Sequence, residues 1–122
     1  MTTENTEKTG RIIGCAIRVS DALGCGFLEK LYEVALAHEL RKSGFQVSQQ
    51  QPFAVLYDGI VVGEYRADLV VDDSVIVEVK AARAIDPAHE AQLLNYLRAT
   101  RLRLGLILNF GTPRMGIKRM VN

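Results

Sequence analysis

Residues 68–80 read Asp68-Leu-Val-Val-Asp-Asp-Ser-Val-Ile-Val-Glu78-Val-Lys80, and this stretch decides the fold. Two runs rich in β-branched residues flank the central Asp-Asp pair, which is typical of a tight turn, so we predict an antiparallel hairpin. The second run is apolar on both faces, which places its strand at the centre of a sheet. Because side chains alternate between the faces of a strand, Glu78 and Lys80 project together, and the turn can bring Asp68 close to Glu78.

The chain around this hairpin shows helical and extended patterns without repeats or a linker. Thr9 and Asp86 are the expected N-caps of the first and third helices, and Asp58-Gly59 marks a second hairpin turn. The fold class is therefore α/β, a mixed sheet flanked by helices in the order ααβββαββ. We predict a flexible segment over 1–8 and a single domain over 9–122, with helices over 9–23, 28–42 and 87–99 and strands over 45–57, 60–71, 74–81, 102–110 and 116–121.

Composition describes an ordinary globular protein. The chain has 122 residues and a mass of 13.5 kDa, and its 48% apolar and 24% charged residues exclude disorder as the main state. No apolar run is long enough to span a bilayer, and the first ten residues lack the apolar region of a signal peptide, so we expect a cytoplasmic protein without membrane contact. Cys15 and Cys25 form neither a disulfide framework nor a zinc pattern, so we expect both to be reduced, small apolar residues.

Charge is divided unevenly along the chain, although the net charge is only +1. Residues 1–90 hold nine Lys/Arg and all 14 Asp/Glu, which gives −5, whereas residues 91–122 hold six basic residues and no acid, which gives +6. Such an arrangement can bind metal ions with one part and phosphates with the other, or can simply be a solvated surface. The six basic residues are Arg98, Arg101, Arg103, Arg114, Lys118 and Arg119.

Asp68, Glu78 and Lys80 form the strongest chemical signal. Burying three charges at a mostly apolar sheet is costly unless they pair or bind something. Paired carboxylates form a hard-oxygen site suited to Mg²⁺ or Mn²⁺, and the ammonium can orient a water or stabilise charge on a phosphate. The alternative is a surface ladder of Glu78 and Lys80 with Asp68 as a turn residue.

Two helices carry further candidates. On the third helix, Gln92 and Tyr96 are four residues apart and share a face that can overhang the acidic site, where they could hold a water or a phosphate. They are otherwise helix-surface residues, and we expect His89 to be solvated near the helix N-terminus. Glu29, in the first turn of the second helix, is favoured there by the helix dipole alone. It becomes a metal ligand only if that helix packs beside the hairpin.

Several motifs together resemble the small bacterial GxxExxY proteins of the PD-(D/E)XK nuclease-like superfamily. The resemblance covers residues 10–120 and implies a restriction-endonuclease-like core. It implies that Asp68, Glu78 and Lys80 form the core motif, with Ala67 in place of the proline in the motif's name, and that Glu29 is the helix-borne acid. Gln92 and Tyr96 resemble the Q-x-x-x-Y motif of the exonuclease branch. The motifs are Gly26-Phe-Leu-Glu29-Lys-Leu-Tyr32, Tyr65-Arg-Ala-Asp68, Glu78-Val-Lys80, Gln92-Leu-Leu-Asn-Tyr96-Leu97 and Gly105-Leu-Ile-Leu-Asn109-Phe-Gly111.

Two functions follow from these observations. The first is a metal-dependent nuclease in which Asp68, Glu78 and the Val79 carbonyl bind Mg²⁺ or Mn²⁺ and Glu29 completes the shell. Lys80 positions the attacking water, and Gln92 and Tyr96 hold the phosphate. The expected substrate is nucleic acid, DNA rather than RNA, whose backbone would be contacted by Arg98, Arg101, Arg114, Lys118 and Arg119.

The second function is a non-catalytic nucleic-acid-binding or homo-oligomeric interaction module on the same fold. The small size of the chain favours assembly into a homo-oligomer, and the net charge of +1 argues against tight, unaided binding to DNA. Gly105-Leu-Ile-Leu108 and the apolar faces of the first two helices are the expected interfaces.

Overall fold

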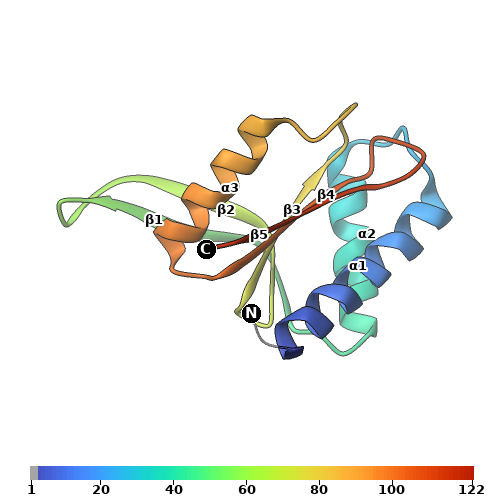
Figure 1. Ribbon diagram of the computed structural model, residues 1–122, viewed down its shortest axis with the longest axis horizontal. Helices are drawn as coiled ribbons and strands as arrows, with labels where there is room; N and C mark the ends of the chain where they lie inside the picture. Colours follow the sequence, from blue (N-terminus) through green and yellow to red (C-terminus); the bar gives the residue numbers. More distant parts are fainter. Residues whose placement is uncertain (1–2) are drawn as a thin grey trace.

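The computed structural model describes residues 3–122, with side chains from residue 6, and shows a mixed α+β fold (Figure 1). Its element order confirms the predicted ααβββαββ. The boundaries differ from the predicted ones by a few residues, apart from the start of the first helix. The elements are α1 (Thr3–Leu23), α2 (Glu29–Lys42), β1 (Val47–Tyr57), β2 (Ile60–Val71), β3 (Val75–Lys80), α3 (Pro87–Thr100), β4 (Leu104–Asn109) and β5 (Gly116–Val121).

The five strands form one sheet in the order β1-β2-β3-β4-β5, so β3 is central as predicted. β3 and β4 are parallel, with α3 in the connection between them, and the other neighbours are antiparallel. Both predicted hairpin turns are present, and the φ angles of Asp58, Gly59, Asp72 and Asp73 lie between 52° and 76°. Two successive positive φ angles give a turn whose twist matches that of the flanking strands.

Helices cover both faces of the sheet (Figure 1). α1 and α2 pack on one face over a core that includes Tyr32, Leu36, Val77 and Leu106, all fully buried. α3 packs on the other face through Leu93 and Leu97. A Cβ on Gly105 of β4 would lie 2.9 Å from the Leu93 side chain, so glycine allows α3 to approach the sheet closely.

The helix ends include one correct and one wrong prediction. Asp86 caps α3 by accepting a hydrogen bond from Ala88 N–H at 2.7 Å, and Pro87 begins the helix, as predicted. The His89 ring accepts from Asp86 N–H at 3.2 Å, so this half-buried residue is a capping group rather than a solvated side chain. The predicted cap at Thr9 is wrong, because α1 begins at Thr3 and the Thr9 hydroxyl donates to the Thr6 carbonyl inside the helix.

Residues 3–8 are therefore helical, and residues 1 and 2 of the predicted flexible segment lie outside the described residues. The two cysteines are free, as expected, but only Cys15 is buried, whereas Cys25 is exposed between two glycines. Across the described residues, no helix is long and apolar enough to cross a membrane.

The expected interface at Gly105-Leu-Ile-Leu108 is wrong. All six residues of β4 are buried, since β3 and β5 flank the strand and helices cover both of its faces. These apolar residues belong to the core of one chain and are not available to a second.

A long two-stranded arm projects from the sheet, where the outer parts of β1 and β2 extend beyond the other strands (Figure 1). β2 pairs with β3 only from Leu69 to Val71, so the backbone of residues 60–67 of β2 pairs only with β1. A register shift between Val55 and Leu56 marks a β-bulge in this arm.

Candidate active site

The site lies at the fork where β2 and β3 separate. Their ladder ends at the pair Leu69 and Val77, so the next backbone groups of β3 lose their partners on β2. Asp68 replaces that partner, because its Oδ2 accepts a hydrogen bond from Val79 N–H at 2.8 Å. The N–H and C=O groups of one strand residue point to the same side, so the Val79 carbonyl also faces the fork, whereas the Lys80 carbonyl accepts from Phe110 N–H beside β4.

Glu78 shares the fork with Asp68. Burial, and next the negative charge of Asp68, raise the pKa of Glu78 to about 8. The Tyr65 hydroxyl donates a hydrogen bond to Glu78 Oε1 and holds this carboxyl group in place. The positive charge of Lys80 acts in the opposite direction on the pKa of Glu78. The structure thus brings Asp68, Glu78 and Lys80 together, as strand alternation predicts.

The raised pKa of Glu78 predicts that the metal-free protein loses stability as the pH rises. In the folded protein Glu78 keeps its proton up to about pH 8, whereas in the unfolded chain it loses the proton near its ordinary pKa of 4.5. The folded state therefore binds more protons across this window, and the free energy of unfolding falls by roughly 2–4 kcal/mol from pH 5 to pH 8. Urea unfolding in a chelator at several pH values measures this fall.

Glu78→Gln is expected to flatten the profile and to be more stable than the wild type at pH 8, since the amide cannot ionise. Glu64→Gln is the matched control, because it makes the same change at an exposed acid on β2 and should keep the wild-type profile. Parallel profiles for the wild type and Glu78→Gln would show that Glu78 is not the group responsible.

An aromatic stack supports Glu78 from the α3 side. The Tyr65 ring lies against the Tyr96 ring, with centroids 3.5 Å apart and planes 13° apart, and Phe53, opposite Tyr65 on β1, stacks with Tyr65 at 6.1 Å. Burial and the nearby Glu78 charge raise the pKa of Tyr65, so its hydroxyl remains a donor. Tyr96 therefore reaches the site through Tyr65, whereas Gln92, one turn earlier on the same helix, has an exposed side chain.

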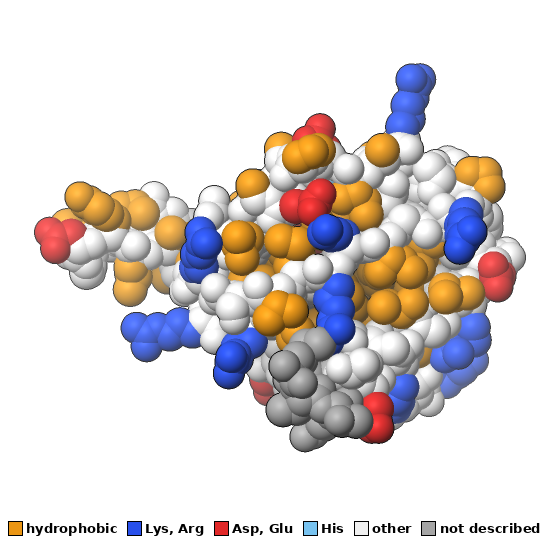
Figure 2. Space-filling view, in the orientation of Figure 1, with side chains coloured by type: hydrophobic (Ala, Val, Ile, Leu, Met, Phe, Trp, Pro, Cys, Tyr) orange, Lys and Arg blue, Asp and Glu red, His pale blue; other side chains and the backbone are white. Residues whose placement is uncertain are grey.

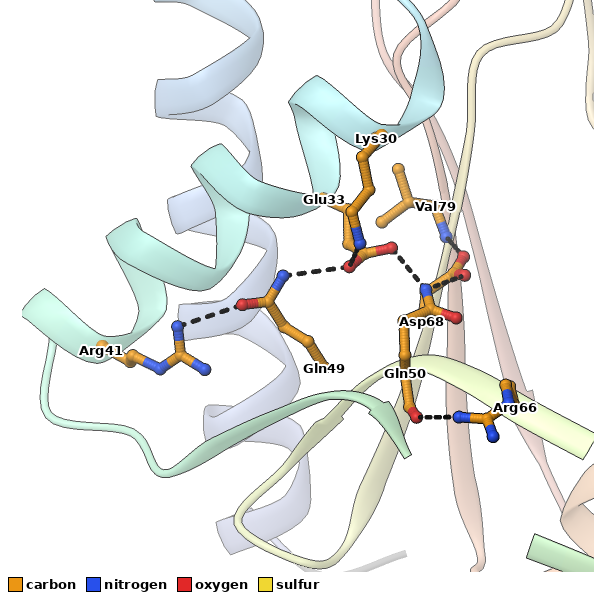
Figure 3. A network of polar contacts seen from close by, with 8 residues as sticks. All are labelled: Lys30, Glu33, Arg41, Gln49, Gln50, Arg66, Asp68 and Val79. Carbon is orange, nitrogen blue, oxygen red and sulfur yellow. Dashed lines mark hydrogen bonds and ion pairs between the residues drawn. The ribbon is translucent and has the colours of Figure 1, made fainter. Parts of the chain in front are cut away.

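A second chain of polar contacts links Asp68 to α2 (Figure 3). Glu33 is a buried acid, 4% exposed, and it accepts hydrogen bonds from Lys30 at 2.9 Å and Gln49 at 3.0 Å. The Gln50 side-chain amide lies between two carboxylates, at 2.6 Å from Glu33 Oε1 and 3.3 Å from Asp68 Oδ1. The φ of Gln50 is +52°, an uncommon value for a residue with a side chain. This network holds the Asp68 side chain through Oδ1, whereas Val79 N–H bonds Oδ2.

Sequence reasoning did not identify Glu33, Gln50 or Tyr65 as site residues. Glu33 lies four residues after Glu29, so both occupy one face of α2, and this spacing was the available signal. Gln50 carries no comparable signal, because it reaches the site through the left-handed backbone that interrupts β1.

The G-x-x-E-x-x-Y motif contains one residue at the end of β3 and one residue with a structural role. Glu29 Oε2 accepts a hydrogen bond from Ala81 N–H at 3.3 Å, so this acid lies beside the residue that follows Lys80. Tyr32 is fully buried and structural, because its hydroxyl donates to the Gly24 carbonyl at 2.6 Å and accepts from Phe27 N–H at 3.2 Å. Gly26 supplies the φ of +115° that the connecting loop requires.

The basic residues of the C-terminal part do not form one continuous surface at the site. Arg101 is the C-cap of α3 and lies beside Asp73, Ser74 and Leu104. Because β3 and β4 are parallel, this end of the sheet is about 16 Å along β3 from Lys80. The other predicted backbone contacts are also dispersed. Arg98 is exposed in the last turn of α3, Lys118 pairs with Glu90 at 3.3 Å, Arg119 is half-buried on β5, and Arg114 lies beside α1 near Ile17 and Asp21.

The donor set at the fork fits a hard divalent cation. Two carboxylates, from Asp68 and Glu78, lie close enough for one to raise the pKa of the other, and the Val79 carbonyl faces the same side. Oxygen donors of this kind suit Mg²⁺ or Mn²⁺. Among the described side chains, residues 6–122, no group of three or more His, Cys, Asp or Glu is arranged to hold a metal ion, so Glu29 does not join Asp68 and Glu78 in such a group.

Comparisons with known proteins agree with this geometry. A family model described as the PD-(D/E)XK nuclease superfamily matches residues 6–120. Among solved structures, the crystal structure of SSO0001 is similar in fold, with a TM-score of 0.60 and 20% sequence identity over 77% of this chain. The matched region is 50% of SSO0001, so the chain spans about half the length of that protein. No curated protein matches the chain.

Proposed function

Because the chain belongs to the PD-(D/E)XK nuclease superfamily, we propose that it is a metal-dependent nuclease that hydrolyses phosphodiester bonds of nucleic acid. The observation that carries the proposal is the convergence of Asp68 and Glu78 at the β2–β3 fork, with Lys80 on the same face as Glu78. Burial, followed by repulsion from the Asp68 carboxylate, raises the pKa of Glu78, and a bound cation would relieve that repulsion.

Asp68, Glu78 and the Val79 carbonyl would hold the cation, which we propose to be Mg²⁺ or Mn²⁺. When bound, such an ion supplies Lewis-acid polarisation of a phosphate and lowers the pKa of water. The Tyr65 hydroxyl and the Gln50 amide orient the two carboxylates, each through a hydrogen bond to one of them. Glu29 supports the site from the end of β3 through its bond to Ala81 N–H.

The remaining residues act on the substrate. The Lys80 ammonium orients the attacking water and stabilises negative charge on the phosphate, since an ammonium donates hydrogen bonds but cannot ligate a cation. Gln92 and Tyr96 contact the phosphate from α3. The substrate proposed is DNA rather than RNA, with Arg98, Arg101, Arg114, Lys118 and Arg119 as sequence-independent contacts whose contribution weakens as salt rises.

A cleavage assay tests the proposed function most directly. Single-stranded DNA, double-stranded DNA and RNA are incubated with the protein in Mg²⁺, in Mn²⁺ and in chelator. If at least one DNA substrate is cleaved, and only when the ion is added, the result supports the proposed nuclease activity. The absence of cleavage from all substrates, by protein shown to bind the ion, would contradict it.

Binding of the ion is expected to stabilise the protein, because a ligand that binds the folded state raises the melting temperature by mass action. Millimolar Mn²⁺ should raise the melting temperature by several degrees, and Asp68→Asn should remove most of that gain and all ion-dependent cleavage. The asparagine oxygen can still accept the hydrogen bond from Val79 N–H, so the fork is preserved. Differential scanning calorimetry with and without Mn²⁺ measures the shift.

Asp58→Asn provides the matched control for Asp68→Asn. It removes one carboxylate from the turn of the arm, where φ is +53° and asparagine is tolerated, and it should leave both the Mn²⁺ shift and cleavage unchanged. If Mn²⁺ raises the melting temperature of Asp68→Asn as much as that of the wild type, the ion does not bind at Asp68.

The alternative is a non-catalytic nucleic-acid-binding module on the same fold. The predicted phosphate-binding residues lie at separate places on the surface and do not lead to the fork. This arrangement favours a binding module, because binding phosphates at separate places requires no chemistry at the fork. Nucleic-acid binding that is unaffected by the ion and by Asp68→Asn would support this module.

A further inference from the structure

Glu33 is a buried acid on α2, and its burial requires an explanation. Figure 2 shows Asp and Glu side chains at the surface of the face that it draws, where water solvates them. Glu33 is only 4% exposed, and Tyr32, Leu36 and Ala37 of the same helix are fully buried. A buried carboxylate is costly unless hydrogen bonds satisfy it, and a well-packed apolar residue often stabilises such a position as well or better. The stability of α2 alone therefore does not account for an acid here.

Three donors hold the Glu33 carboxylate in a fixed position (Figure 3). Lys30 and Gln49 donate to Oε2 at 2.9 and 3.0 Å, and Gln50 donates to Oε1 at 2.6 Å. Gln49 is itself held, because its side-chain oxygen accepts a hydrogen bond from Arg41 at 3.3 Å. The donors come from α2 and β1, so the carboxylate joins the helix to the edge strand of the sheet.

The Gln50 amide connects this fixed carboxylate to Asp68. The amide nitrogen carries two hydrogens and lies 2.6 Å from Glu33 Oε1 and 3.3 Å from Asp68 Oδ1, so it can donate one hydrogen to each. The shorter bond is the one to Glu33, which indicates that Glu33 determines where the amide lies. Gln50 has a φ of +52°, which is unfavourable for a residue with a side chain. Such a conformation persists where the surrounding contacts enforce it, and it often marks a functional position.

We propose that Glu33 is a positioning residue of the ion site, which acts through the Gln50 amide to hold the Asp68 carboxylate in one orientation. Asp68 accepts a hydrogen bond at both oxygens, from Gln50 at Oδ1 and from Val79 N–H at Oδ2. Without the first bond the carboxylate can rotate, because only the second one holds it. The effect on the ion rests on the proposed function, in which Asp68 is a ligand.

Two other roles for Glu33 predict different results. If Glu33 were itself an ion ligand, its loss would weaken ion binding whether or not Gln50 were present. If Glu33 only joined α2 to β1, its loss would loosen the fold in general, and Asp68 would be affected no more than other groups near β3. Measurements at Asp68 and at a reference position therefore separate the three roles.

Val79 N–H reports the position of Asp68 in the absence of any ion, because Asp68 Oδ2 is its acceptor. Phe110 N–H is the internal reference, since it bonds the last carbonyl of β3 at 2.8 Å on the β4 side. The variants Gln50→Met and Glu33→Gln keep the approximate side-chain volume and break the link to Asp68. In both variants, hydrogen exchange measured by NMR should become roughly tenfold faster at Val79 and stay unchanged at Phe110.

Glu33→Asp is the second variant at the buried position. It keeps the negative charge near Lys30 but withdraws the carboxylate from Gln50 by one methylene group. It should therefore accelerate the exchange of Val79 in the same way, and it decides the outcome where Glu33→Gln does not fold.

Calorimetric titration with Mn²⁺ measures the effect on the ion. Glu33→Gln and Gln50→Met should each raise the dissociation constant by roughly tenfold, as is usual for groups that orient a metal ligand. The double variant should bind Mn²⁺ no more weakly than the weaker single variant, because both changes break the same link. Glu39→Gln is the matched control, since it makes the same change at an acid of α2 that pairs with Arg18 and Lys42, and it should bind Mn²⁺ like the wild type.

An unchanged exchange rate of Val79 in folded Gln50→Met would overturn the proposal, and so would equal acceleration at Val79 and Phe110. Losses of Mn²⁺ affinity that multiply in the double variant would also overturn it, because Glu33 would then act without Gln50. A wild type that binds no Mn²⁺ would contradict the proposed function instead, and the exchange of Val79 would still test the link between Glu33 and Asp68.

Discussion

Lys80→Ala is expected to lower the rate of phosphodiester cleavage by roughly 10²–10⁴-fold, the range typical of losing a positioned proton-transfer or charge-stabilising group. Lys80 projects on the same face as Glu78, and its charge acts on the pKa of that carboxyl group. Among the side chains that the structure describes, those of residues 6–122, Lys80 takes part in no ion pair, so its ammonium is available to a water or a phosphate. Single-turnover cleavage at saturating ion measures the loss.

The same variant should bind the ion at least as well as the wild type, because it removes a positive charge beside the two carboxylates. This separates Lys80 from Asp68, whose replacement should remove most of the ion binding and all ion-dependent cleavage. Lys42→Ala is the matched control, since it removes an exposed lysine at the end of α2 and should keep the wild-type rate. Equal cleavage by Lys80→Ala and the wild type would show that the lysine is structural.

Gly111→Ala is expected to destabilise the fold by roughly 3 kcal/mol or more, because a side chain there has no room. A Cβ on Gly111 would collide with the backbone of Ala81 and Ala82, and its distance to the Ala81 carbonyl carbon would be 2.7 Å. This close approach is held by Asn109, whose amide bonds both the N–H and the C=O of Ala82 at 2.9 and 3.0 Å. Thermal and urea unfolding measure the loss.

The segment that Gly111→Ala displaces follows Lys80 directly, so the variant should also lower cleavage even where it remains folded. Gly10→Ala is the control, because a Cβ there meets nothing within 4 Å and α1 should gain about 0.5–1 kcal/mol from alanine. An unchanged unfolding midpoint for Gly111→Ala would show that Ala81 and Ala82 can move away at little cost.

Local patterns were enough to predict the elements and part of the site. The apolar run Val75-Ile-Val77 predicted a central strand, and strand alternation predicted Glu78 and Lys80 on one face; the structure shows both. Asp86-Pro87 predicted the start of α3 from capping chemistry alone. The wrong prediction at Thr9 has a physical reason, since the residues before it also form helix and a buried hydroxyl can bond within a helix.

Contacts between residues that are far apart in the sequence could be identified only from the tertiary structure. The fork between β2 and β3, the Gln50 amide between Glu33 and Asp68, and the stack of Tyr65 on Tyr96 each join segments that are far apart in the sequence. The same holds for the burial of β4, which removed the expected interface, and for the exposure of the apolar residues at the tip of the β1–β2 arm. The sequence by itself determined the elements, their order and the acids and lysine of the central hairpin, because backbone periodicity is a local property. Only the tertiary structure decided which carboxylates meet and which apolar residues remain outside the core, because packing between distant segments sets both.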